Sequence, residues 1–88
     1  MQETEPEDDE RIIKLDARGL ICPEPVILTR NKLRKATPGT TLVLVATDPS
    51  TTRDIPLLCK YLGYSLLEEQ RFADEFIYTI GVKEPRLQ

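Results

Sequence analysis

Two cysteines are the most chemically distinctive residues of this chain, and the chain has no histidine to accompany them. Cys22 and Cys59 are 37 positions apart, whereas a structural zinc site normally takes four cysteine or histidine ligands, so we expect no metal site. Without histidine there is no Cys–His pair of the kind that activates the thiols of proteases and acyl transferases. Any catalysis must therefore use a cysteine without a conventional base.

Cys22 lies in the stretch RGLICPEPV and is followed directly by a rigid Pro-Glu-Pro segment. Taken alone, it could be a packing residue, half of a disulfide, a metal ligand or a nucleophile. A helix N-terminus lowers a thiol pKa, but Pro23 and Pro25 remove N–H groups that would solvate a thiolate, and Glu24 adds a negative charge. Arg18 would offset that charge if its side chain folded back toward the sulfur. The direction of the pKa shift therefore stays open.

The position of Cys22 in the fold is predicted from the spacing of apolar residues. Residues 12–17 alternate, which predicts a strand, and a helix is expected over 23–36 because proline suits a first helical turn. Cys22 then lies at a strand-to-helix junction, where α/β proteins tend to place chemistry. The helix residues expected to face the sheet are Val26, Thr29, Leu33 and Ala36.

The remaining elements complete one domain. The continuous apolar run at 41–47 predicts a strand that is central in a sheet or covered on both sides. A second helix should end at Gly63, and residues 64–71 and 75–82 should form an antiparallel hairpin. The candidates for the N-cap of this helix are Ser50, Thr51 and Thr52, and its core face comprises Ile55, Leu58, Cys59 and Leu62. We therefore interpret Cys59 as a small buried packing residue.

The order of elements, β-α-β-α-β-β, predicts an α/β two-layer sandwich. Its four-stranded mixed sheet should carry both helices on one face, because the first crossover is right-handed. In the last strand, one face should be formed by Phe76, Tyr78, Ile80 and Val82.

Length and composition are typical of a single soluble domain of 88 residues, with 40% apolar and 31% charged residues. No apolar run approaches the roughly 20 residues of a membrane span. The first ten residues lack the basic start and apolar core of a secretory signal. We therefore expect a cytoplasmic protein, in which thiols stay reduced and disulfides are uncommon.

Charge is distributed unevenly along the chain. Residues 1–10 carry six negative charges and no positive one, whereas the remainder has 12 basic and nine acidic residues. We expect residues 1–10 to be a disordered acidic tail, or a segment that tunes partner choice. The folded domain should comprise residues 11–83, with 84–88 as a short C-terminal tail. Direct nucleic-acid binding is not expected, because the remainder has a net charge of only +3 and no run of aromatic residues interleaved with basic ones.

Two segments, LDARGLICPEPV and DPSTTRDIPLLC, resemble the TusA (SirA-like) family of small sulfur-carrier proteins. The similarity runs from about Leu15 to Cys59, and the order of elements extends it to about Val82. The family hallmark is Cys-Pro-x-Pro at the start of the first helix, which is Cys22 to Pro25 in this chain.

The resemblance implies that Cys22 accepts a sulfane sulfur from a cysteine desulfurase or another persulfide donor. It would hold that sulfur as a persulfide and pass it to a downstream sulfur-relay protein, without a cofactor. The best-known destination in the family is 2-thiouridine at the wobble position of tRNA, and relatives serve sulfur oxidation or molybdenum-cofactor synthesis. Such transfer resembles thiol–disulfide exchange, in which the partner's thiol is the leaving group. No side chain of the protein therefore has to protonate a leaving amine.

The neighbours of Cys22 receive supporting and docking roles. The supporting residues are Arg18, Gly19, Pro23, Glu24 and Pro25. Ile27 or Leu28 should be exposed near Cys22, and basic residues there could dock acidic partners or form only a solvated face. The expected docking residues are Ile27, Arg30, Arg34, Lys35 and Arg53. The aspartates Asp16, Asp48 and Asp54 are expected to serve in caps and turns, although partner contacts are open to them.

Two other classes of protein remain open at this stage. One is a regulatory or RNA-binding module in which Cys22 is only structural. The other is a redox protein that joins Cys22 and Cys59 in a disulfide, although the core position of Cys59 argues against it. For the sulfur carrier itself we expect a monomer when free, with no membrane partner.

Overall fold

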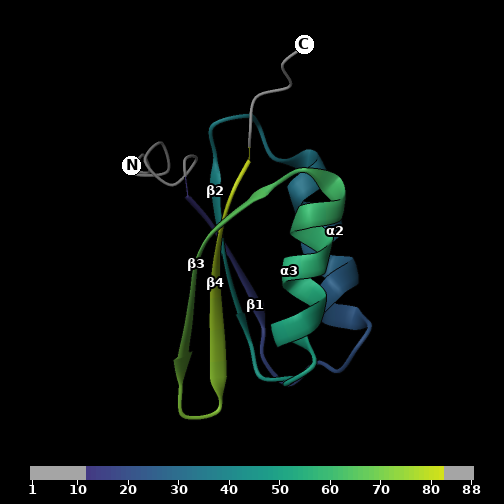
Figure 1. Cartoon of the computed structure of the whole chain (residues 1–88), viewed down its shortest axis with the longest axis vertical. Coiled ribbons are helices and arrows are strands. Elements are labelled where there is room, and N and C mark those ends of the chain that lie inside the picture. The colour runs from purple at the N-terminus through teal and green to yellow at the C-terminus, as the bar shows by residue number, and fades with distance from the viewer. Residues whose placement is uncertain (1–11, 83–88) are drawn as a thin grey trace, which may run out of the picture.

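One mixed sheet of four strands forms the base of the fold (Figure 1). The structure is a computed structural model, and it describes residues 12–82. The strands are β1 (Ile12–Ala17), β2 (Thr41–Ala46), β3 (Ser65–Phe72) and β4 (Glu75–Gly81), in the order β1-β2-β4-β3 across the sheet. β1 and β2 run parallel, whereas β4 is antiparallel to both of its neighbours, β2 and β3.

β2 lies in the interior of the sheet, between β1 and β4. Its register pairs Leu42 with Ile13 of β1 and with Ile80 of β4, so alternate residues of three strands form one apolar face. The residues of β2 on that face are buried, whereas those on the opposite face are only partly covered. The apolar run of β2 therefore reflects a central position, one of the two arrangements predicted for it.

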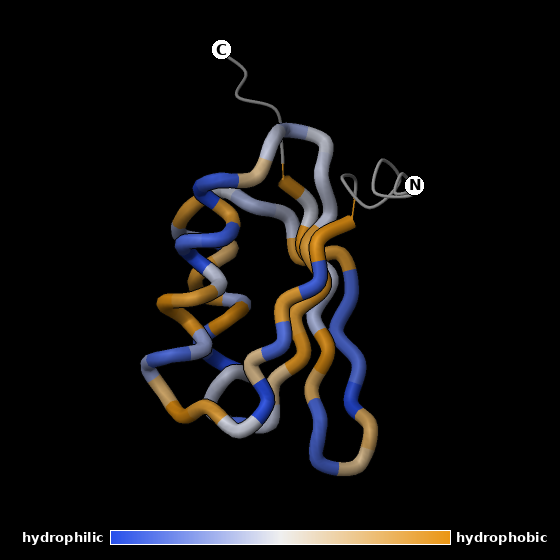
Figure 2. Tube along the Cα trace, turned by 180° about the vertical axis from the view of Figure 1, so that it is seen from behind, coloured by the Kyte–Doolittle hydropathy of each residue, from blue (hydrophilic) through white to orange (hydrophobic). Residues whose placement is uncertain are grey.

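The two helices, α2 (Glu24–Lys35) and α3 (Thr51–Leu62), lie side by side on the same face of the sheet (Figure 1). Figure 2 shows the apolar residues concentrated in the central strands, whereas much of β3 is hydrophilic. The buried apolar core consists of Ala17, Leu33, Leu42, Leu44, Ala46, Ile55, Cys59, Phe76, Tyr78, Ile80 and Val82. This arrangement confirms the predicted two-layer sandwich, its order of elements and the packing role of Cys59.

The two helices begin and end close to the predicted residues, but one predicted cap is wrong. Ser50 occupies the N-cap of α3 and its side chain does not cap the helix. The carboxylate of Asp48 instead accepts hydrogen bonds from the N–H and the hydroxyl of Ser50. Gly63 ends α3 as predicted, with a left-handed φ of 85° that disfavours other residues. Leu62 was predicted to face the core, but it lies in the last turn of α3 and is 41% exposed.

Within residues 12–82 no helix is long and apolar enough to cross a membrane. The predicted acidic tail at 1–10 and the C-terminal tail at 84–88 lie outside the described residues, so these two segments remain predictions. The same holds for the first and last residues of the predicted domain, at positions 11 and 83.

Candidate functional site

The loop that carries Cys22 is tied to the loop between β2 and α3. The N–H of Cys22 donates to Oδ2 of Asp48 at 2.6 Å, and the N–H of Gly19 donates to Oγ1 of Thr47 at 2.9 Å. These two loops meet because β1 and β2 are parallel, which brings their carboxyl ends to the same edge of the sheet. Cys22 itself is exposed, and its peptide bond to Pro23 is cis.

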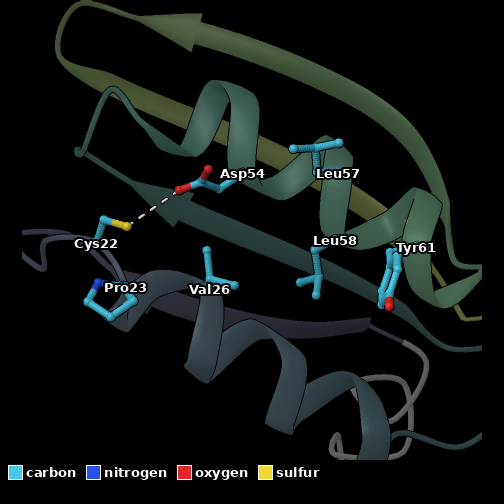
Figure 3. A pocket seen from close by; sticks show the side chains of 7 residues that line it. All are labelled: Cys22, Pro23, Val26, Asp54, Leu57, Leu58 and Tyr61. Carbon is cyan, nitrogen blue, oxygen red and sulfur yellow. Dashed lines mark hydrogen bonds between the residues drawn. The ribbon is translucent and has the colours of Figure 1, made fainter.

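The side chain in hydrogen-bond contact with the thiol comes from α3. Sγ of Cys22 donates a hydrogen bond to Oδ2 of Asp54 at 3.5 Å (Figure 3). The other oxygen of this carboxylate, Oδ1, lies 3.7 Å from Nε of Arg53. The side chain of Asp54 is 22% exposed, so it is shielded from solvent more than that of Arg53, which is 75% exposed.

These neighbours decide the direction of the pKa shift that the sequence left open. The hydrogen bond to Asp54 raises the pKa of the Cys22 thiol above its ordinary value, and partial desolvation adds to that rise. The negative charges of Asp54 and Asp48 act in the same direction, whereas the positive charge of Arg53 opposes them. Glu24, to which the sequence assigned this effect, is not among the groups that shift this pKa.

Arg18 does not fold back toward the sulfur, an arrangement that the sequence left open. Its guanidinium binds the carboxylate of Asp16, with Nε 2.9 Å from Oδ1, and lies 3.5 Å from Glu75 of β4. The ion pair lowers the pKa of Asp16 to about 2 and raises the pKa of Arg18. Arg18 is therefore occupied by two carboxylates, those of Asp16 and Glu75, and not by the thiol.

An apolar groove of about 460 Å³ opens beside the thiol, between α2 and α3 (Figure 3). Its lining residues are Cys22, Pro23, Val26, Asp54, Leu57, Leu58 and Tyr61. Figure 3 shows the thiol and the carboxylate at one end of the groove and the tyrosine at the other. Leu57 is 56% exposed and Tyr61 is 88% exposed, which leaves apolar surface available to a partner.

The predicted docking residues are spread along α2 and the start of α3. Ile27 is exposed in the first turn of α2, and Leu28 is exposed as well, although only one of the two was expected to be. Arg34 and Lys35 border a separate polar pocket at the far end of α2, about 16 Å along the helix from its first residue, Glu24. The structure brings Arg53 next to the site through Asp54, and it leaves Arg30 exposed on α2.

Four residues of this site were not predicted from the sequence to belong to it. Asp48 and Asp54 were assigned to caps and turns, and Leu57 and Tyr61 were not singled out. A signal for Asp48 was present, because it directly follows a strand predicted to run parallel to the first. Side chains that follow two such strands meet at one edge of the sheet, so Asp48 and Cys22 could have been placed together.

Cys59 has surroundings of the opposite kind. It is 2% exposed in the core, and burial raises the pKa of its thiol to about 11, with the charge of Glu69 contributing. Both cysteines are free, one exposed and one buried, and Cys59 does not line the groove. The structure therefore favours neither the predicted alternative of a redox pair nor a second exposed thiol at the site.

Fold and site together define a class: a small α/β sandwich that presents one exposed cysteine beside an apolar groove. The model of the family described as sulfurtransferase TusA matches residues 13–82. The chain belongs to this family, and the resemblance recognised in its sequence is confirmed.

Individual relatives agree with this assignment. The chain is 52% identical over 69 residues to the sulfur carrier protein TusA of Pseudomonas paraeruginosa, which covers 78% of this chain and 87% of that relative. It is 49% identical to the sulfur carrier protein TusA of Pseudomonas putida, with 78% and 86% covered. The solved SirA-like protein of Desulfitobacterium hafniense matches with a TM-score of 0.72 at 22% identity, covering 82% of this chain and 99% of that one. This last similarity supports the fold alone.

Proposed function

We propose that this protein is a sulfur carrier in which Cys22 holds the transported sulfur as a persulfide. The observation that carries the proposal is an exposed, free thiol at the end of an apolar groove, in a chain of the sulfurtransferase TusA family. The second cysteine, Cys59, is buried and therefore out of reach of a partner protein. A sulfur carrier needs a donor and an acceptor, and we propose a cysteine desulfurase or similar persulfide donor and a downstream relay protein.

The capture step balances without an oxidant or a reductant. The Cys22 thiol gives up its proton, and its sulfur attacks the terminal sulfur of the donor's persulfide. The donor's S–S bond breaks, and its electron pair stays with the donor's own cysteine sulfur, which takes up a proton. In the release step an acceptor thiolate attacks the terminal sulfur on Cys22 and forms an S–S bond with it. The bond between that sulfur and Sγ of Cys22 breaks, and Cys22 regains its proton.

The groove supports this chemistry by offering a place for the partner to bind. A donor must bring its persulfide within bonding distance of Cys22, and exposed apolar side chains such as Leu57 and Tyr61 provide contact area next to it. The basic residues of α2 are suited to steer an acidic partner toward the helical face that carries the groove. We therefore propose that the partner docks in the groove and contacts residues around it, namely Ile27, Arg30, Arg34, Lys35 and Arg53.

Mass spectrometry tests the assignment of Cys22. Wild-type protein incubated with a cysteine desulfurase, cysteine and pyridoxal phosphate should gain about 32 Da, the mass of one sulfur atom, on Cys22. Cys22→Ser is nearly isosteric but cannot form a persulfide, so it should gain nothing. Cys59→Ser is the matched control and should load normally. Loading that persists in folded Cys22→Ser protein would contradict the proposal.

For the destination of the sulfur we propose 2-thiolation of the tRNA wobble uridine in the cytoplasm, as the family resemblance implies. Deletion of the gene should then abolish thiolated tRNA, measured by mass spectrometry of tRNA nucleosides. Complementation with wild type should restore the modification, and complementation with Cys22→Ser should not. Unchanged tRNA thiolation in the deletion strain would redirect the proposal to sulfur oxidation or molybdenum-cofactor synthesis.

A further inference from the structure

A carboxylate in hydrogen-bond contact with the carrier sulfur is an unexpected feature of the site. Reactive cysteines usually lie in electropositive surroundings, where a neighbouring cation or helix N-terminus stabilises the thiolate. Here Oδ2 of Asp54 accepts a hydrogen bond from Sγ of Cys22 at 3.5 Å, and the carboxylate is 22% exposed (Figure 3). Sulfur transfer as described above does not need this contact, so its presence calls for a separate explanation.

We propose that Asp54 protects the carrier sulfur: its carboxylate keeps Cys22 slow to react with small molecules in solution, while a thiol held in a docked protein still reacts. The inference rests on the proposed function, because it concerns the same sulfur in its empty and loaded states.

In the empty carrier, protection follows from the protonation of the thiol. The thiolate is the reactive form toward electrophiles and oxidants, and a hydrogen-bonded carboxylate beside the sulfur disfavours it. The raised pKa of Cys22 is the expected consequence. At neutral pH the free protein therefore presents mainly a thiol, which oxidants and electrophiles attack slowly.

In the loaded carrier, Asp54 acts on the leaving group. A small thiolate in solution would attack the terminal sulfur, the bond from that sulfur to Sγ would break, and the electron pair would stay on Cys22. Negative charge would then develop 3.5 Å from the carboxylate of Asp54, and a thiol with a raised pKa leaves more slowly.

A docked acceptor meets the same obstacle but has a compensating advantage. Its thiol is held against the terminal sulfur, and the effective concentration of a well-oriented group far exceeds that of a free thiol in the cell. The carboxylate therefore lowers the rate at which free thiols remove the sulfur, while proximity keeps transfer to the docked protein partner fast.

Among the charged groups near the thiol, Asp54 is the one whose replacement tests this role. Asp48 also raises the pKa of Cys22, but its carboxylate accepts the N–H groups of Cys22 and Ser50, so replacing it would release the loop. Arg53 acts in the opposite direction and is largely exposed. The carboxylate of Asp54 accepts no backbone N–H among the described hydrogen bonds, so Asp54→Asn should remove the charge and keep the loop.

The first test uses the empty protein and does not depend on sulfur loading. The rate of Cys22 alkylation by iodoacetamide, followed by mass spectrometry across pH, should show a lower thiol pKa in Asp54→Asn. Each tenfold gain in the thiolate fraction is accompanied by an approximately threefold loss of thiolate nucleophilicity. The alkylation rate at pH 7 should therefore rise about threefold for each tenfold gain in thiolate. Asp54→Glu, which keeps a carboxylate, should stay closer to wild type. Asp74→Asn, which removes the same charge in the turn between β3 and β4, should match wild type.

The second test uses protein loaded with sulfur. The half-life of the added mass on Cys22 in the presence of glutathione should be shorter in Asp54→Asn than in wild type or Asp74→Asn. Thermal denaturation of each variant establishes that it is folded, and Asp54→Ser carries the same test should Asp54→Asn fail to fold.

The two proposals fail in different ways. An alkylation profile of folded Asp54→Asn that coincides with wild type would overturn the role of Asp54 and leave sulfur carriage intact. An equal half-life in glutathione would overturn its effect on the loaded state. Failure of wild type to gain sulfur at all would overturn the proposed function, while the alkylation profile would still report on Asp54.

Discussion

At the scale of single residues, this protein contains the same amino acid in two opposite settings. Cys22 is exposed, and a neighbouring carboxylate raises the pKa of its thiol. Cys59 is buried, and the loss of solvent raises the pKa of its thiol. The two causes have different consequences, because a neighbouring charge tunes reactivity at an accessible atom, whereas burial removes the atom from reaction.

The buried thiol should make the stability of the fold fall at alkaline pH. The pKa of Cys59 is about 11 in the folded protein and about 9 when exposed. Above about pH 9 the unfolded chain therefore releases a proton that the folded chain keeps. The stability that the protonated Cys59 thiol contributes below pH 9 is then lost as pH rises toward 11. The free energy of unfolding should fall by up to about 1.4 kcal/mol per pH unit in this range.

Urea denaturation of wild type and Cys59→Ala at about pH 8, 9, 10 and 11 would measure this effect. The alanine variant should be less stable at pH 8, because a buried sulfur is lost, but its free energy of unfolding should fall less steeply above pH 9. Other titrating groups are common to both proteins and cancel in the difference. Parallel curves would show that Cys59 ionises equally in both states.

At the scale of elements, the start of α3 is held to the sheet by one buried hydrogen bond. Oγ1 of Thr51 lies 2.8 Å from the hydroxyl of Tyr78 on β4, and both side chains are 1% exposed. The same Oγ1 donates to the carbonyl oxygen of Asp48 at 2.7 Å. Asp54 lies one turn further along α3, so this anchor also fixes the carboxylate that contacts the thiol.

Thr51→Val should destabilise the protein by about 1 to 3 kcal/mol, because it preserves the shape of the side chain but leaves the hydroxyl of Tyr78 buried and unpaired. The matched control is Thr52→Val, whose hydroxyl is exposed and donates to Pro49, and it should cost about 0.5 kcal/mol or less. Urea denaturation measures both changes.

A double-mutant cycle identifies the partner. Tyr78→Phe removes the hydroxyl that Thr51→Val leaves unpaired, so the double variant should lose less stability than the sum of the two single variants. Additive losses would mean that the contact between Thr51 and Tyr78 contributes nothing to stability.

At the scale of the whole molecule, the site lies on the helical layer. Cys22 and the groove lie beside α2 and α3, and the exposed side of α2 carries Arg30, Lys32, Arg34 and Lys35. Lys14 of β1 is also exposed, but it alternates with Ile13 and Leu15, which pack on the core, so it lies on the opposite face of the sheet. Basic charge is therefore present on both faces, and only one of them adjoins the thiol.

Reversal of charge on the helical face should slow sulfur capture. Arg30→Glu should lower the rate of loading by the desulfurase by up to about tenfold at low salt, with a smaller effect at high salt, because charges around an interface mainly control association. Lys14→Glu makes the same change in charge on the opposite face and should load like wild type. Equal slowing by both variants would show that net charge matters and the position of the charge does not.

Much of the fold was predictable from the sequence because it depends on neighbours along the chain. The spacing of apolar residues gave the strands and helices to within one or two residues, and Gly63 marked the end of α3 correctly. The position of Cys22 at a strand-to-helix junction and the burial of Cys59 followed from the same patterns. Local periodicity shows which face of each element is apolar, and a single core leaves few ways to combine those faces.

Only the tertiary structure decided the surroundings of the thiol. Asp54 is 32 positions from Cys22, and Arg18 pairs with Glu75 across the sheet instead of approaching the sulfur. The groove likewise joins residues of α2 and α3 that no local pattern connects. Contacts between polar side chains depend on how two loops and two helices pack to within about an ångström. The sequence therefore determined the position of Cys22 in the fold, and the packing determined which charged groups lie beside its thiol.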